Sequence, residues 1–140
     1  MRLWHQELIP FLPRGQLLAQ HRECCALRGR GWGRKHSVVD YVFRHSRERL
    51  YAYHAMVMDE MSRRDYSVAP EWWDVRYRGK RLKAAAANRC RRFGPRIYRE
   101  HDDDYLAECL KNLRRKGVKL AYYSFRLLCL CDLFGLVTEV

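Results

Sequence analysis

The stretch between Pro13 and Gly29 constrains the fold more than any other part of the sequence, because it has the features of one bounded helix. Proline is tolerated where a helix begins, and glycine commonly follows where one ends. Between them, apolar residues recur at three- and four-residue spacings, which is typical of a helix with one buried face. The sequence therefore predicts a helix over residues 14–28. We expect its buried face to contain Leu17, Leu18, Cys24 and Cys25, with His21 in the middle.

Glu23 falls on the opposite side of this predicted helix. Ala19 and Ala26 are its neighbours there, so the carboxylate stands among small side chains where the backbone of a ligand can come close. Arg22 flanks the same surface. The ordinary alternative for such an Arg-Glu pair is a solvated surface glutamate.

Two further helices are predicted by the same periodicity. Residues 46–65 start at Ser46, a favoured N-cap residue, and residues 102–116 start with aspartates and end in basic residues, which suits the helix dipole. The expected buried stripes are Leu50, Tyr53, His54, Val57, Met58 and Met61 in the former, and Leu106, Cys109, Leu110 and Leu113 in the latter. Residues 38–43 suit a strand or a helix, and we favour helix or coil. The chain is thus predicted to be all-α, a compact single domain over residues 1–140, with about three main helices and long loops.

Both ends of the chain are rich in apolar residues. Residues 1–13 contain Pro10 and Pro13, which argue against a long helix, and we expect this arm to fold back onto the domain. Residues 118–140 form an apolar C-terminal extension. Arg126 and Asp132 interrupt it, so a core or oligomer-forming helix is predicted there in place of a membrane span.

The charge of the chain indicates an anionic partner. There are 28 Lys and Arg against 16 Asp and Glu, giving a formal net charge of +12. Nucleic acid is the commonest such partner, although a ribosome-associated or membrane-surface protein has a similar composition. The glycine-rich loop over residues 29–36 lacks the spacing of a P-loop, and it is expected either to contact phosphates through Arg30, Arg34 and Lys35 or to be merely solvated.

Cysteines and histidines show no pattern of a metal site. The six cysteines have no regular spacing and no C-x-x-C pair, and no histidine stands at a metal-ligand spacing from them. We interpret the cysteines as reduced thiols of a cytoplasmic protein without a signal peptide, and His54 as a core histidine. No metal and no cofactor are expected.

A run of aromatic and basic residues follows at residues 70–81. Its aromatic rings suit stacking on an exposed base, while its basic side chains suit phosphate contacts. The alternative is a Trp pair that packs in the core with snorkelling basic neighbours.

The stretch Gln16-Leu17-Leu18-Ala19-Gln20-His21-Arg22-Glu23 resembles the Gln-x-Leu-x-Ala-x-x-Arg-Glu signature of the pyrimidine dimer DNA glycosylases of the phage endonuclease V type. Those proteins also have an arginine just behind the mature N-terminus, as in Met1-Arg2 here. Residues 70–80 resemble a Pro-x-Trp run found at the C-terminus of that family, although they lie mid-chain in this sequence. Residues 46–66 and 97–118 are both candidates for one further helix of the family.

The resemblance implies a DNA repair glycosylase with AP lyase activity on damaged duplex DNA, with pyrimidine dimers as the lesion. The nucleophile is then the chain's α-amine, a group whose reference pKa of about 7.7–8.0 leaves part of it uncharged at neutral pH. Because Arg2 is bulky, Met1 is expected to be retained and to align with the family's nucleophilic residue. Glu23 would stabilise the cationic sugar and help remove its 2′ proton, while Arg2 and Arg22 bind phosphates.

The resemblance and the basic residues together define the candidate site. The catalytic candidates are Met1, Arg22 and Glu23. The DNA-contacting candidates are Arg2, His21, Arg30, Arg34, Lys35, Trp72, Trp73, Arg76, Tyr77, Arg78 and Lys80. A third arginine of the family falls at Ala26, so Arg28 or Arg30 is expected to supply its phosphate contact. Two alternatives stay open: a non-catalytic basic protein that binds DNA or RNA, and a helical protein that binds a partner through its apolar tail.

Overall fold

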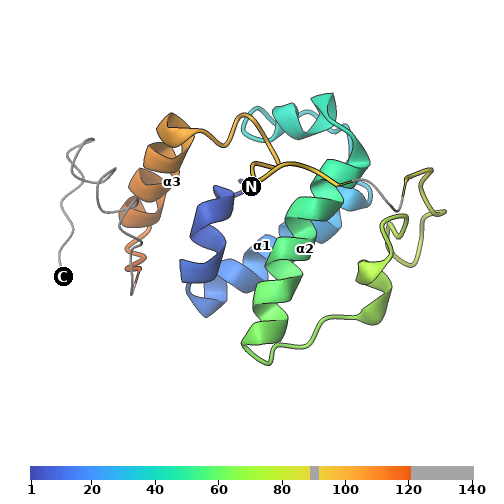
Figure 1. Cartoon of the computed structure of the whole chain (residues 1–140), viewed down its shortest axis with the longest axis horizontal. Helices are drawn as coiled ribbons and strands as arrows, with labels where there is room; N and C mark the ends of the chain where they lie inside the picture. The colour runs from blue at the N-terminus through green and yellow to red at the C-terminus, as the bar shows by residue number, and fades with distance from the viewer. Residues whose placement is uncertain (89–91, 121–140) are drawn as a thin grey trace.

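The computed structural model describes residues 1–88 and 92–120, and this part of the chain contains helices and no strand. The elements are the 3-10 helix η1 (Gln6–Phe11), α1 (Arg14–Arg28), η2 (Asp40–Arg44), α2 (Arg47–Arg63), η3 (Pro70–Trp73) and α3 (Asp103–Arg115) (Figure 1). The predicted helical class is confirmed, and the three main helices lie within two residues of their predicted bounds. The predictions for residues 121–140 fall outside the described residues.

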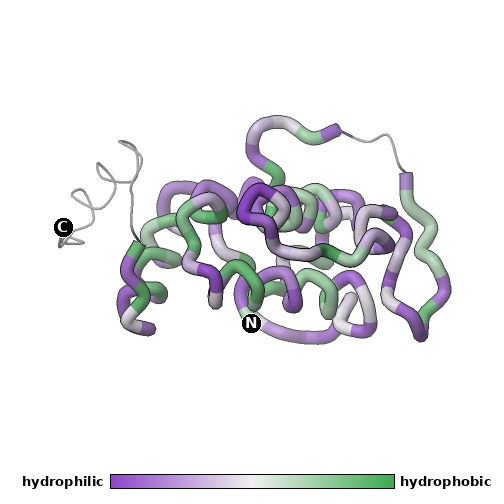
Figure 2. The backbone as a smooth tube through the Cα atoms, turned by 90° about the horizontal axis from the view of Figure 1, so that it is seen from below, coloured by the Kyte–Doolittle hydropathy of each residue, from purple (hydrophilic) through white to green (hydrophobic). Residues whose placement is uncertain are grey.

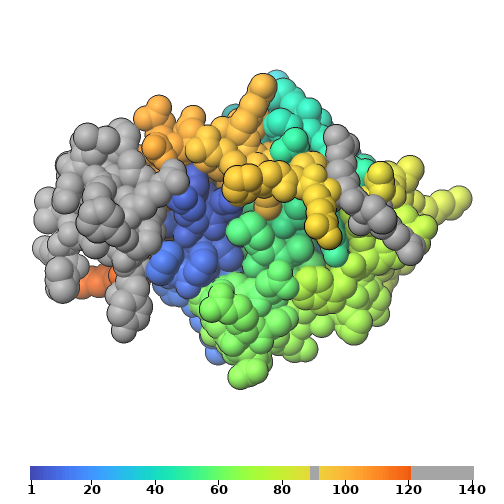
Figure 3. Space-filling model, in the orientation of Figure 1, coloured from blue at the N-terminus to red at the C-terminus, as the bar shows by residue number. Residues whose placement is uncertain are grey.

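Helices α1 and α2 pack across each other in the middle of the molecule, with η1 beside them (Figure 1). The predicted stripe of α2 is buried throughout. Helix α3 lies at one end of the long axis, and the segment over residues 66–88 lies at the other, where it forms much of the visible surface (Figure 3). Along the described helices, hydrophilic and hydrophobic stretches alternate, as expected for helices that each bury one face (Figure 2). None of the helices in residues 1–88 and 92–120 has the length and apolar character needed to cross a membrane.

The N-terminal arm folds back onto the domain, as predicted. Leu3, Leu8, Ile9 and Leu12 are almost completely buried, and Trp4 is 5% exposed. Pro10 lies inside η1, and the short 3-10 form accommodates the proline that a long helix would exclude. The arm is therefore part of the hydrophobic core, and its packing fixes the position of the first residues against the domain.

The buried face of α1 differs from the prediction. Its buried residues are Leu17, Gln20, Cys24, Leu27 and Arg28, whereas Leu18, His21 and Cys25 are only half-buried. The face is thus turned away from His21 and toward Gln20. The reason is the arm, because its first residues use Gln20 as a hydrogen-bonding partner, which pulls a polar side chain into the interior.

The helix ends are capped in different ways. Asp102 caps α3 by accepting a hydrogen bond of 2.8 Å from the Tyr105 amide. Ser46 occupies the N-cap position of α2, as predicted, but its side chain makes no capping hydrogen bond. At the end of α1, the Gly31 amide donates to the Ala26 carbonyl at 2.8 Å, which turns the chain sharply into the basic loop.

Replacing Gly31 by alanine should destabilise this turn. A Cβ atom at Gly31 would lie 2.7 Å from the Ala26 carbonyl oxygen, so backbone would have to move. We expect the free energy of unfolding to fall by about 1–3 kcal/mol, the usual range for overpacking. Gly15→Ala is the matched control, because a Cβ there meets nothing within 4 Å and should add about 0.4–1 kcal/mol. Urea titrations that give the two variants the same midpoint would contradict the prediction.

Candidate active site

The beginning of the chain and Glu23 share one pocket. The Arg2 backbone amide donates to Glu23 Oε2 at 3.4 Å. A cavity of about 250 Å³ opens beside this contact. It is lined by Met1, Arg2, Trp4, Glu23, His36, Val38, Asn112 and Lys116. Met1 is 46% exposed, so the first residue of the chain lies at an accessible surface next to the carboxylate.

Gln20 joins the chain start to Glu23. Its Nε2 donates to the Arg2 carbonyl and to Glu23 Oε2, both at 3.0 Å. Its Oε1 accepts from the Trp4 amide at 2.7 Å and from the Tyr53 hydroxyl at 3.0 Å. The side chain is completely buried. Sequence reasoning missed this residue, and the only available signal was a glutamine inside the motif that the resemblance rested on.

The Arg2 side chain reaches α3. Arg2 Nη1 forms an ion pair with Glu108 Oε1 at 2.9 Å, and the guanidinium lies 5.8 Å from the centre of the Tyr105 ring. The Tyr105 hydroxyl also donates to the Leu3 carbonyl. Helix α3 therefore contacts the chain start in addition to α1. In this state Arg2, which the sequence indicated as a phosphate ligand, has a protein carboxylate as its partner.

Four of the exposed basic residues lie on α1 and in the loop that follows it. Arg22, Arg30, Arg34 and Lys35 are all exposed, and His36 from the same loop reaches the pocket of Glu23. Arg22 is thus the sequence neighbour of Glu23, and the loop that contains Arg34 and Lys35 reaches the pocket through His36. That arrangement suits contacts along a phosphodiester backbone.

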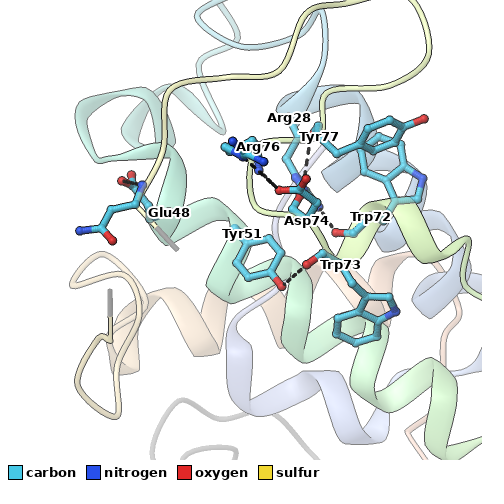
Figure 4. Close-up of polar contacts among 9 residues, drawn as sticks. Arg28, Glu48, Tyr51, Trp72, Trp73, Asp74, Arg76 and Tyr77 are labelled. Carbon is cyan, nitrogen blue, oxygen red and sulfur yellow. Dashed lines mark hydrogen bonds and ion pairs between the residues drawn. The ribbon is translucent and has the colours of Figure 1, made fainter. Parts of the chain in front are cut away.

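Arg28 holds the aromatic and basic segment in place (Figure 4). Its guanidinium donates to the carbonyls of Trp72 at 2.8 Å, Asp74 at 2.6 Å and Tyr77 at 3.3 Å. It also lies 5.1 Å from the centres of the Tyr51 and Trp72 rings, and it is 4% exposed. Burial lowers the pKa of the guanidinium. Arg28 is therefore an internal anchor, and of the two arginines proposed to replace the family's third arginine, Arg30 is the accessible one.

The two tryptophans of this segment differ in their surroundings. The Trp72 ring packs edge-on against Tyr77, with centroids 4.8 Å apart, and against His54. Trp73 is 38% exposed and points away from these rings (Figure 4). Arg76 lies 3.6 Å from the Asp74 carboxylate. All three aromatic residues were expected to stack on a base. The Trp73 ring is exposed enough to do so, whereas the rings of Trp72 and Tyr77 pack against each other.

An open groove of about 490 Å³ separates this segment from the end of α1. It is lined by Cys25, Ala26, Gly29, Arg30, Gly31, Trp72, Arg78, Gly79, Lys80, Arg81 and Leu82. Arg78 also donates to the carbonyls of Arg28 and Gly29, which fixes the groove's wall. The groove brings together Arg30, Arg78 and Lys80, three of the residues expected to contact DNA.

A cluster of His21, Cys25 and His54 lies between α1 and α2, with its ligand atoms within 4.8 Å of one another. Sequence spacing did not reveal it, because His54 follows Cys25 by 29 residues. Arg28 Nη1 lies 2.9 Å from His54 Nδ1, and a guanidinium only donates, so His54 carries its hydrogen on Nε2. That hydrogen points to His21 Nδ1 at 2.8 Å and leaves no lone pair for a metal ion. A metal-binding histidine needs the opposite tautomer, with an acceptor behind it, so these residues do not fit a metal in this arrangement.

Three histidines should make the fold less stable in mild acid. Burial lowers the pKa of His21, takes that of His54 well below its usual range, and lowers that of His101 to about 3. Each binds a proton more weakly when folded, so the unfolded state takes up more protons below its pKa of about 6.5. Stability is therefore complete above that pH and falls below it, by up to about 1.4 kcal/mol per pH unit for each histidine. Urea unfolding between about pH 7.5 and pH 5 measures this, and a constant free energy of unfolding would contradict it.

Comparison with known proteins agrees with this geometry. The family model described as pyrimidine dimer DNA glycosylase matches residues 1–74. That range contains Met1, Glu23 and α2, and it ends before α3, so residues 46–66 lie within the match and residues 97–118 lie beyond it. No curated protein and no solved structure matches the chain. Since the match covers half of the sequence, the chain belongs to the pyrimidine dimer DNA glycosylase family.

Proposed function

We propose that this protein is a DNA repair glycosylase with AP lyase activity, which acts on damaged duplex DNA through a Schiff base to the α-amine of Met1. The observation that best supports the proposal is the shared pocket of Met1 and Glu23, in which the Arg2 amide lies 3.4 Å from the Glu23 carboxylate. A nucleophile and a general base must lie within reach of one sugar, and a pocket lined by both Met1 and Glu23 supports that arrangement.

The first chemical step uses the amine. Its lone pair forms a bond to C1′ of the damaged nucleotide, and the N-glycosidic bond breaks. The departing base takes that electron pair and a proton from solvent. Transfer of one proton from the attacking nitrogen to O4′, as the C1′–O4′ bond breaks and the sugar ring opens, gives the protonated imine. The Glu23 carboxylate, which lines the same pocket as Met1, stabilises the positive charge that develops on the sugar.

The second step breaks the strand. The imine acidifies the 2′ proton, Glu23 accepts that proton, and the electron pair forms the C2′–C3′ double bond. The 3′ phosphate leaves with the electrons of the C3′–O bond. Hydrolysis of the imine then returns the free amine. Glu23 is the fitting base because Gln20 and the Arg2 amide fix its Oε2, while the pocket gives a sugar access to it.

Exposed cations are proposed to bind the duplex around this pocket. Arg22 lies next to Glu23 on α1, and Arg30, Arg34 and Lys35 follow in the loop. Arg78 and Lys80 extend the basic surface into the groove beyond α1. Trp73, the more exposed aromatic residue of its segment, is the one we propose for contact with a base.

A non-catalytic protein that binds DNA or RNA is the second candidate. The net charge of +12 and the basic groove are sufficient for it, and it requires no role for the pocket of Glu23. The two functions differ in one chemical product. Only an amine-based lyase becomes covalently linked to abasic DNA when a hydride donor reduces the imine.

Borohydride trapping is therefore the test. The full chain is incubated with a duplex that contains one abasic site, and sodium cyanoborohydride is added. We expect a covalent complex and a strand broken at the abasic site. A duplex with a tetrahydrofuran residue, which has no aldehyde equivalent at C1′, is the matched control. Binding to both duplexes without any trapped complex would establish the non-catalytic function.

A further inference from the structure

We propose that Gln20 is a positioning residue that sets the separation between the chain's amine and the Glu23 carboxylate. The inference rests on the proposed function. It arises from a buried side chain that joins the start of the chain to the proposed base: its amide nitrogen donates to the carbonyl of residue 2 and to Glu23 Oε2.

The orientation of this amide is determined by its partners. The Trp4 backbone amide is a donor, so the group 2.7 Å from it must be the Gln20 oxygen. The Arg2 carbonyl is an acceptor, so the group 3.0 Å from it must be the nitrogen. The Tyr53 hydroxyl lies 3.0 Å from the same oxygen, although its one hydrogen has a closer acceptor in the Trp4 carbonyl at 2.5 Å. Both amide hydrogens and the oxygen are thus used, and no flipped orientation satisfies the same set.

Gln20 acts on both sides of residue 3. Its side chain forms hydrogen bonds to the backbone of Arg2 and of Trp4, and Leu3 between them is completely buried. The segment that leads to the amine therefore cannot slide along α1 without breaking these contacts. The same nitrogen also holds the Glu23 carboxylate. One side chain therefore positions both the segment that leads to the amine and the proposed base.

An amide is the only common side chain of this shape that supports both partners. A carboxylate at position 20 would place acceptor against acceptor at the Arg2 carbonyl and at Glu23 Oε2. A thioether would offer no donor and leave buried polar groups unpaired. Either change lets the amine and the carboxylate move apart, and a displacement of about 1 Å can cost about 10²-fold in rate.

The test compares Gln20→Met and Gln20→Glu with the unchanged protein on abasic duplex. Tyr41→Phe is the matched control, since it removes a buried hydroxyl that bonds His101 and does not line the pocket of Glu23. Unfolding midpoints of all four proteins identify losses that come only from stability. For Gln20→Met we expect cyanoborohydride trapping to slow about 10²-fold while the Kd for the duplex is retained. Tyr41→Phe should trap at the normal rate.

Gln20→Glu supplies a readout that a merely structural role would not move. When protonated, its carboxylic acid regains one donor, so the ratio of its trapping rate to that of the unchanged protein should rise as pH falls from about 8 to 5. For Gln20→Met the same ratio should stay constant, because a thioether does not titrate. Normal trapping by folded Gln20→Met, or a pH-independent ratio for Gln20→Glu, would overturn the inference. Absence of trapping by the unchanged protein would overturn the proposed function instead.

Discussion

Glu23→Gln should lower strand cleavage at an abasic site by about 10²–10⁴-fold, the usual contribution of a general base, and leave duplex affinity nearly unchanged. The reason is that different residues are expected to perform the chemistry and to bind the DNA. Glu23 lies in the pocket with Met1, whereas the exposed cations expected to bind phosphates lie outside it. The substitution keeps the shape of the side chain and removes its ability to accept a proton. It also puts an amide opposite the Gln20 donor, where its own oxygen can still accept.

Single-turnover cleavage and a binding titration on the same abasic duplex measure the two effects. Asp59→Asn is the matched control, because it removes one negative charge from an exposed position on α2 and should leave cleavage unchanged. If cleavage by Glu23→Gln stays within the range of this control, Glu23 is not the base. A parallel loss of affinity would instead mean that the substitution had disturbed the DNA surface.

Helix positions were predictable because their signals are local. Helix α1 begins directly after Pro13 and ends directly before Gly29, as the sequence indicated. The periodic stripe predicted for α2 forms its buried face. These features depend on residues within one or two turns of each other, which is the range over which caps and periodicity act. The closeness of Met1 and Glu23 was anticipated by the family resemblance, since no spacing rule relates a chain terminus to a helix face.

The parts that escaped prediction depend on backbone groups from distant segments. Gln20 is buried because it bonds main-chain atoms of residues 2 and 4. Arg28 is buried because three carbonyls, 44 to 49 residues later, converge on its guanidinium. Every residue has such backbone groups, so the sequence pattern does not mark the ones that will face a given side chain. Arg28 was therefore expected to contact a phosphate and Gln20 was given no role, although the fold uses both side chains internally.

Blocking the α-amine of Met1 should abolish imine trapping and leave duplex binding intact. An acetylated nitrogen has no lone pair available for attack on C1′. One added residue preserves an amine but displaces it by up to about 3.6 Å, the reach of one extended residue. The carbonyl of Arg2 is held by Gln20, so the chain start cannot retreat to compensate. Both changes leave the exposed cations of α1 and its loop in place.

The pocket contains a second primary amine, which makes this test sharper. Lys116 lines the same cavity, with its ammonium 5.4 Å from the centre of the Trp4 ring. Lys116→Arg keeps the positive charge and removes the primary amine, so it should trap normally if Met1 is the nucleophile. The protein with one residue added before Met1 should form no trapped complex, although it retains Lys116. If the extended protein still forms the trapped complex, and loses it only when Lys116→Arg is added, then the nucleophile is Lys116 at the end of α3. Trapping absent from every protein, including the unchanged one, would leave the basic surface as a DNA-binding site without this chemistry.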